Sequence, residues 1–121
     1  MNHPFHLSIG VKSIDDTIKF FSEVLSGKVT HRELAYANME LFGHQITLKP
    51  NESISPDLLD FHFGFNMSLA EFNKISDKVL SSSTEFVHMW PKVVDEGTQM
   101  ERKKMYLKCP TGYLVELKGY Q

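Results

Sequence analysis

The amino-acid sequence contains an internal repeat, and this repeat is the feature that most limits how the chain can fold. Residues 5–11 read Phe-His-Leu-Ser-Ile-Gly-Val, and residues 61–67 read Phe-His-Phe-Gly-Phe-Asn-Met. In both stretches apolar residues alternate with other residues, which predicts a strand with one apolar face. His6 and His62 each begin the opposite face of their strand. Two such strands predict two similar structural units in one chain.

The segments that follow the two strands are also alike. Ser13 and Ser68 are each followed, three residues later, by an acidic residue, which is the pattern of a capping box at a helix N-terminus. Apolar residues then recur at helical spacing. They are Ile14, Ile18, Phe21 and Leu25 after the first box, and Leu69, Phe72, Ile75 and Val79 after the second. The first helix is expected to end at Gly27 and the second to fray at residues 81–83.

Three short strands are expected after each helix. They are residues 28–34, 36–42 and 44–49 in the first half, and residues 85–90, 101–108 and 113–118 in the second. The second half is longer, and its extra residues are assigned to a polar loop at 91–99. The expected fold class is α+β, with two tandem βαβββ units forming a curved mixed sheet around a cup-shaped site and helices on the outer face. The chain is expected to be one domain, residues 1–121, with unit 1 at about 4–49, a linker at 50–56 and unit 2 at about 60–120.

Composition and charge exclude several classes of protein. The formal net charge is −2 and the basic residues are dispersed, so no nucleic-acid partner is expected. The one basic run, residues 102–104, is interpreted as a solvated strand edge. No apolar run approaches the roughly 18 residues of a membrane span, and no signal-peptide pattern is visible. With a single cysteine in addition, the sequence predicts a cytoplasmic protein without membrane contact.

Three side chains form a candidate metal-binding set on the face opposite the apolar one. His6 and His62 occupy equivalent positions of the two repeats, and Glu116 projects from the same face by alternation with Val115 and Leu117. Two imidazoles and one carboxylate leave coordination positions open and suit Fe(II), Mn(II) or Zn(II). The simpler interpretation is two polar histidines that bind nothing and a surface carboxylate paired with Lys118 or Lys108.

With these residues the chain resembles the vicinal oxygen chelate superfamily, which contains glyoxalases, extradiol ring-cleaving dioxygenases, fosfomycin-modifying enzymes and bleomycin-binding proteins. The resemblance rests on residues 5–7, residues 61–64, and the stretch Pro-Thr-Gly-Tyr-Leu-Val-Glu-Leu at 110–117. In this family a Pro-x-Gly turn leads into a strand whose glutamate binds metal. The resemblance therefore implies that His6, His62 and Glu116 bind a divalent metal ion, with Fe(II) favoured and Zn(II), Mn(II) or Ni(II) as alternatives.

The resemblance also assigns three further positions. Thr47 stands where four-ligand members such as glyoxalases carry Glu, Gln or His, so the ligand set is closer to that of extradiol dioxygenases. Tyr106 resembles a tyrosine that contacts substrate oxygens in those enzymes, and His44 resembles a histidine that handles protons, which makes both candidate catalytic residues. The simpler interpretation of Tyr106 is an amphipathic aromatic side chain on a strand, and that of His44 is a histidine in a turn. A shifted strand register would instead bring Gln45 or His44 to the metal as a fourth ligand.

The function expected from the resemblance is a metal-dependent enzyme acting on a small substrate with two vicinal oxygens, and within that class an extradiol-type dioxygenase. The alternatives are a glyoxalase-like lyase or isomerase, a thiol transferase, and a non-catalytic drug-binding protein of the bleomycin-resistance type. Small members of the family commonly pair, so a homodimer with a small-molecule partner is expected.

Overall fold

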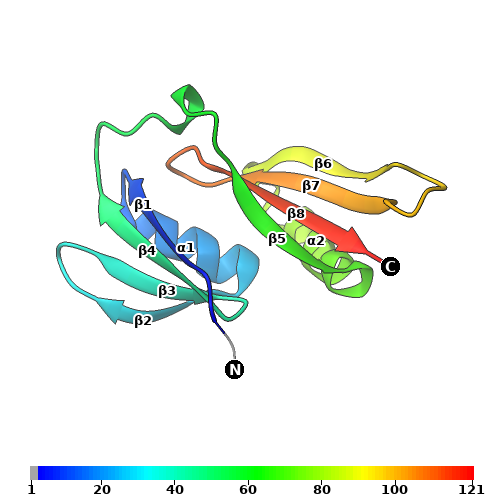
Figure 1. The fold of residues 1–121 in the computed structure, drawn as a ribbon. Coiled ribbons are helices and arrows are strands. Elements are labelled where there is room, and N and C mark those ends of the chain that lie inside the picture. Colours follow the sequence, from blue (N-terminus) through cyan, green and yellow to red (C-terminus); the bar gives the residue numbers. More distant parts are fainter. Residues whose placement is uncertain (1–2) are drawn as a thin grey trace. The chain divides into compact units, whose positions relative to one another are not determined.

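The computed structural model describes residues 3–121 and divides into two compact units, one ending at Ser55 and the other comprising Pro56–Gln121. The first unit contains β1 (His6–Val11), α1 (Ile14–Leu25), β2 (Lys28–Arg32), β3 (Ala37–Leu41) and β4 (His44–Pro50). The second contains the short helix η1 (Pro56–Leu58), β5 (Phe63–Ser68), α2 (Leu69–Ser82), the short helix η2 (Thr84–Phe86), β6 (Val87–Val94), β7 (Arg102–Lys108) and β8 (Leu114–Tyr120) (Figure 1). The tandem βαβββ organisation expected from the repeat is confirmed.

The two units have the same sheet topology. The strand order is β1-β4-β3-β2 in the first sheet and β5-β8-β7-β6 in the second. The first strand of each unit lies parallel to the last strand, whereas the other neighbours are antiparallel. Each sheet is therefore mixed, and the expected α+β class is confirmed.

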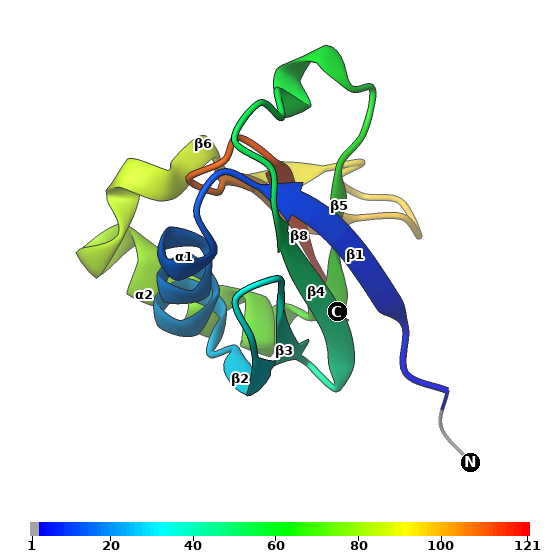
Figure 2. The same cartoon turned by 90° about the vertical axis from the view of Figure 1, so that its left-hand side faces the viewer.

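Each helix covers one face of its own sheet. Helix α1 contacts β3 and β4, and in Figure 2 it lies on one side of the β1–β4 pair. Phe20 and Phe21 of α1 are fully buried, as is Phe72 of α2, which packs against β8. Apolar strand residues complete these cores; they are Met39, Leu41, Ile46 and Leu48 in the first unit and Met105, Leu107, Val115 and Leu117 in the second. The opposite face of each sheet carries the polar side chains of the alternating pattern.

Both capping residues act as expected, but the first helix ends differently. The Ser13 and Ser68 side chains accept hydrogen bonds from the backbone N–H groups of Asp16 and Glu71. At the end of α1 the left-handed residue is Ser26, with φ 56°, and not Gly27. Gly27 packs closely against β3, since a Cβ atom there would lie 2.5 Å from a methyl carbon of Leu41.

The segment expected to be a polar loop at 91–99 is partly a strand. Strand β6 continues through Pro91 to Val94, and its pairing with β7 shifts register between Met89 and Lys92. Proline is tolerated because β6 is an edge strand and the irregularity removes the need for its missing N–H. The interpretation of residues 102–104 as a strand edge is also corrected, because β7 lies between β6 and β8 in the sheet.

The boundary between the units falls inside the expected linker. Strand β4 continues to Pro50, and the second unit begins at Pro56 with η1. That the units form one cooperative domain remains a prediction. Among residues 3–121 no helix is both long and apolar enough to cross a membrane.

Candidate metal and substrate site

Glu116 is the one buried acidic side chain among the described residues, and the alternation of β8 places it on the polar face of the second sheet. Its neighbours Val115 and Leu117 are buried on the other face, against α2. Across the sheet Glu116 lies opposite Gly64 of β5 and Tyr106 of β7. Only 8% of the Glu116 side chain is exposed, so its carboxylate needs nearby partners.

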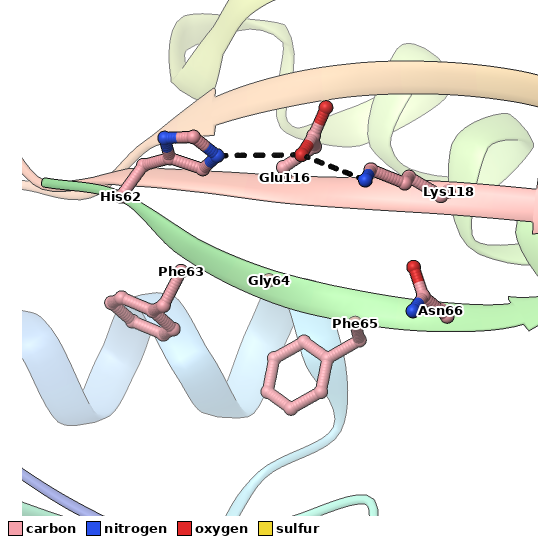
Figure 3. Close-up of a pocket in the computed structure, with 7 residues that line it drawn as sticks. All are labelled: His62, Phe63, Gly64, Phe65, Asn66, Glu116 and Lys118. Carbon is pink, nitrogen blue, oxygen red and sulfur yellow. Dashed lines mark ion pairs between the residues drawn. The ribbon is translucent and has the colours of Figure 1, made fainter.

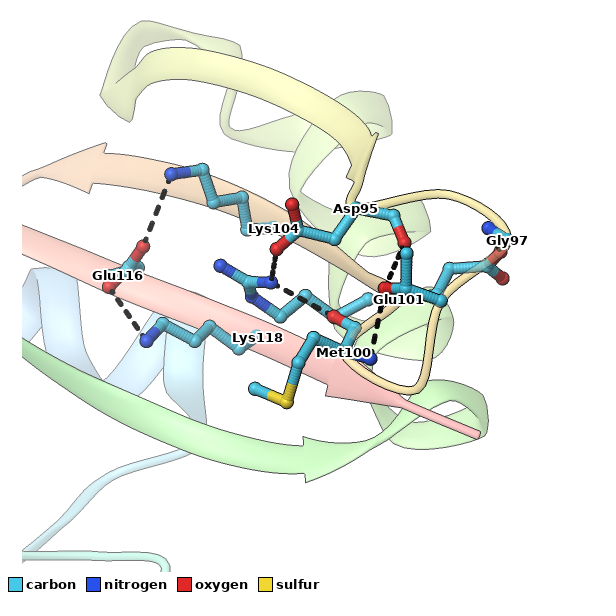
Figure 4. A network of polar contacts seen from close by, with 9 residues as sticks. Asp95, Gly97, Met100, Glu101, Lys104, Glu116 and Lys118 are labelled. Carbon is cyan, nitrogen blue, oxygen red and sulfur yellow. Dashed lines mark hydrogen bonds and ion pairs between the residues drawn. The ribbon is translucent and has the colours of Figure 1, made fainter.

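Three basic side chains supply such partners. The Glu116 Oε1 atom lies 3.4 Å from His62 Nε2 and 3.7 Å from Lys118 Nζ, and its Oε2 atom lies 3.8 Å from Lys104 Nζ. Figure 3 shows His62 and Lys118 approaching the carboxylate from opposite directions along the strands, and Figure 4 shows Lys104 reaching it from the neighbouring strand. The carboxylate is thus surrounded by nitrogen atoms that carry or can carry positive charge.

Tyr106 forms the wall of this cluster on the β7 side. Its ring meets the His62 ring edge-to-face, with 5.5 Å between centroids, and the Lys104 ammonium lies 5.6 Å from the Tyr106 ring centroid. Burial raises the pKa of the Tyr106 phenol, and the charge and hydrogen bonding of Glu116 raise it further. The phenol is therefore held in its protonated form, as a hydrogen-bond donor, at neutral pH.

A pocket of about 220 Å³ opens beside these residues within the second unit. Its polar lining comes from His62, Asn66, Glu116 and Lys118, which lie on one side of the strands, while Phe63 and Phe65 point to the other side (Figure 3). Gly64 lines its floor, where a Cβ atom would collide with the backbone oxygen of Glu116. Glycine at this position therefore keeps β5 and β8 close and the pocket open.

The first unit presents the equivalent positions with different residues. His6 begins β1 and lies opposite Gln45, and Ser8 lies opposite Thr47, as Gly64 lies opposite Glu116 in the second unit. Thr47 therefore occupies the position that corresponds to Glu116. Its hydroxyl donates a hydrogen bond of 2.7 Å to Asn38 Oδ1, so this position is already engaged with its own sheet.

The register of β4 determines which other residues of the first unit accompany His6. No shift interrupts the pairing of β4 with β1 or β3, so Gln45 and Thr47 share the face of His6. His44 lies opposite Leu41 on the face of Ile46 and Leu48, and its Nδ1 accepts a hydrogen bond of 3.0 Å from the Phe5 N–H. A proton-handling role for His44 stays a prediction, and this placement does not favour it.

The three expected metal ligands come from two units. His62 and Glu116 are brought together within the second unit, whereas His6 belongs to the first. Within each unit, the described residues include no group of three or more His, Cys, Asp or Glu side chains that could hold a metal ion. The complete set of His6, His62 and Glu116 remains a proposal.

The His62–Glu116 pair fits a divalent metal ion. Nitrogen and oxygen ligands about 2.1 Å from one metal in tetrahedral or octahedral geometry lie about 2.9–3.4 Å from each other. The 3.4 Å between His62 Nε2 and Glu116 Oε1 falls within that range. Lys104 and Lys118 would have to withdraw from the carboxylate to admit a cation, and their long, partly exposed side chains can do so.

Sequence reasoning missed part of this site. It offered Lys118 or Lys108 as a partner of Glu116, but the structure pairs Glu116 with Lys118 and Lys104. Alternation along β7 does put Lys104 on the same face as Tyr106, which was a usable signal. The position of Lys104 opposite Lys118, however, depends on the strand register, which the sequence did not specify.

The chain belongs to the Glyoxalase/Bleomycin resistance protein/Dioxygenase superfamily, whose model matches residues 3–117. The expected membership of the vicinal oxygen chelate superfamily is thereby confirmed. No match to the chain is found among curated proteins.

Several solved structures share the fold. A glyoxalase/bleomycin resistance protein/dioxygenase from Alicyclobacillus acidocaldarius is 21% identical, with a TM-score of 0.85 over 98% of this chain and 92% of that one. The fosfomycin resistance protein FosX from Listeria monocytogenes is 14% identical, with a TM-score of 0.79 over 100% and 95%. A virulence protein from Salmonella typhimurium is 18% identical, with a TM-score of 0.69 over 100% and 98%. At these identities the similarity establishes the fold alone.

Proposed function

We propose that this protein is a metal-dependent enzyme that acts on a small substrate through two vicinal oxygens, with His6, His62 and Glu116 as the metal ligands. The observation that carries the proposal is the buried Glu116 carboxylate, which lies 3.4 Å from His62 Nε2 at the edge of a polar pocket. A divalent ion bound there would act as a Lewis acid toward substrate oxygens.

The chain's own groups supply the remaining parts of the site. The protonated Tyr106 phenol is adjacent to His62 and Glu116 and can donate a hydrogen bond to a substrate oxygen. Gly64 leaves room for the substrate beside Glu116, and Asn66 offers an amide at the far end of the pocket. Because Tyr106 resembles the tyrosine that contacts substrate oxygens in ring-cleaving dioxygenases, extradiol-type cleavage with Fe(II) is the first reaction to test.

The decisive experiment is elemental analysis of anaerobically purified protein, combined with a catechol oxygen-uptake assay on the same sample. About one divalent ion per chain is expected in the wild-type protein. Oxygen uptake with iron would support the dioxygenase reaction. Zinc, nickel or manganese without uptake would favour a lyase, an isomerase or a thiol transferase instead.

We expect His62→Ala and Glu116→Gln each to reduce metal content from about one ion per chain to near zero, since each removes one of three ligands. His88→Ala and Glu85→Gln are matched controls, because both side chains are exposed and lie outside the pocket. Circular dichroism would verify that each variant is folded. Full metal retention in either ligand variant would refute the proposed ligand set.

A second candidate function is a non-catalytic binding protein for a small molecule. It is favoured by the two ion pairs of Glu116 with Lys104 and Lys118, which can neutralise the carboxylate without a metal. In that case the purified protein would neither contain nor take up a stoichiometric metal. The name of the similar fosfomycin resistance protein makes small antibiotics reasonable ligands to screen.

Homodimer formation and a cytoplasmic location complete the proposal, because small members of the family commonly pair and the chain contains a single cysteine. Light scattering coupled to gel filtration would measure the assembly, and a mass near 13.9 kDa would contradict the dimer.

A further inference from the structure

A row of like charges crosses the polar face of the second sheet, two residues along the strands from Glu116. Lys92 of β6 lies opposite Lys104 of β7, and Lys104 lies opposite Lys118 of β8. Asn66 of β5 lies opposite Lys118 and completes the row. Directly opposed like charges on neighbouring strands destabilise a sheet, so this arrangement requires compensation.

Glu116 compensates only part of this charge. It is shared by Lys104 and Lys118 at 3.8 and 3.7 Å, while Lys92 has no ion-pair partner among residues 3–121. The next cation on this face of β7 is Arg102, which is already paired with Asp95 at 2.6 Å. The three lysines of the row and the single carboxylate of Glu116 leave a formal excess of two positive charges on this part of the sheet.

We infer that Lys92, Lys104 and Lys118 bind an anionic oxygen group of the substrate, a carboxylate or a phosphoryl group, while the Glu116 end of the pocket holds the reacting oxygens. Lysine ammonium groups are well suited to binding oxyanions, and partial burial strengthens the attraction. Lys118 lines the pocket directly, and the exposed Asn66 amide lies beside it as a neutral hydrogen-bond donor.

The strand geometry also sets the distance between the two parts of the proposed site. The lysine row and the row of Glu116 and Tyr106 are two residues apart on β7 and β8, which corresponds to about 6.7 Å along the strands. The anionic group therefore lies a few bonds from the reacting oxygens. This assignment of a substrate class rests on the proposed function, but anion binding can be measured without any metal.

The test is calorimetric titration of the metal-free full-length protein with inorganic phosphate and, separately, with acetate. Wild-type protein is expected to bind at least one of them, and the preferred ion distinguishes a phosphoryl from a carboxylate group. Lys104→Gln and Lys118→Gln should each weaken binding about tenfold, the usual loss for a charge-assisted hydrogen bond. Lys118→Arg should retain binding, because it keeps the positive charge.

Lys103→Gln is the matched control. It makes the same change of charge on the same strand, but its side chain lies on the other face and bonds to Asn73 of α2. The inference is overturned if wild-type protein binds neither anion, or if Lys103→Gln weakens binding as much as the other two variants. Metal uptake is measured separately on the same proteins. If wild-type protein takes up no metal, the proposed metal-dependent enzyme is refuted, whereas the result of the anion titration still decides whether the anion site exists.

Discussion

At the scale of single residues, the two repeats differ at one equivalent pair of positions that bears on metal binding, Thr47 and Glu116. Both lie on the polar face, opposite Ser8 and Gly64 respectively. The Glu116 carboxylate lies close to basic side chains, whereas the Thr47 hydroxyl donates a hydrogen bond to Asn38. The duplicated architecture therefore carries an ionisable side chain in one copy and a neutral side chain, hydrogen-bonded within its own sheet, in the other.

We expect Thr47→Ala to change metal affinity less than about twofold, because a neutral hydroxyl is a poor ligand for these metals. The variant should lose about 1 kcal/mol of unfolding free energy, because the Thr47–Asn38 hydrogen bond disappears. Calorimetric metal titration and urea denaturation measure the two effects. A loss of metal affinity of about tenfold or more would mean that Thr47 is itself a ligand.

The single cysteine provides a second test at this scale. Cys109 is buried, and this burial raises the pKa of its thiol. Iodoacetamide is therefore expected to alkylate Cys109 about tenfold or more slowly in native protein than in denaturant. Because the folded-state pKa is the higher one, the thiol's contribution to stability is complete below the unfolded pKa and is lost as pH rises through the folded-state pKa. Equal alkylation rates in the two states would contradict the burial.

At the scale of secondary-structure elements, the contact of α2 with β8 depends on a glycine. A Cβ atom on Gly119 would lie 2.5 Å from the Phe72 Cβ atom and 3.3 Å from the Leu69 Cα atom. We expect Gly119→Ala to lower the unfolding free energy by about 1–3 kcal/mol, because the helix must move away from the strand. Urea denaturation gives the value, and an unchanged midpoint would show that the contact is not close.

At the scale of the whole molecule, the two compact units raise the question of whether they unfold together. As parts of one domain they should share a single thermal transition. Trp90, the single tryptophan, lies on β6 and reports the second unit, whereas far-ultraviolet circular dichroism reports both units. The two signals should give the same midpoint, and Gly119→Ala should shift both equally. A second circular dichroism transition without a fluorescence counterpart would show independent units.

Local periodicity and the repeat were enough to predict the order of the main elements, the capping serines and the residues on each face of most strands. Both helices and Glu116 on the polar face could therefore be predicted. The extent of β6 through Pro91 could not, because an edge position and a register shift make that proline acceptable. The position of Lys104 opposite Lys118 and beside Glu116 came from the tertiary structure alone. Side chains on separate strands become neighbours through the hydrogen-bond register between the strands, and local sequence contributes little to that register.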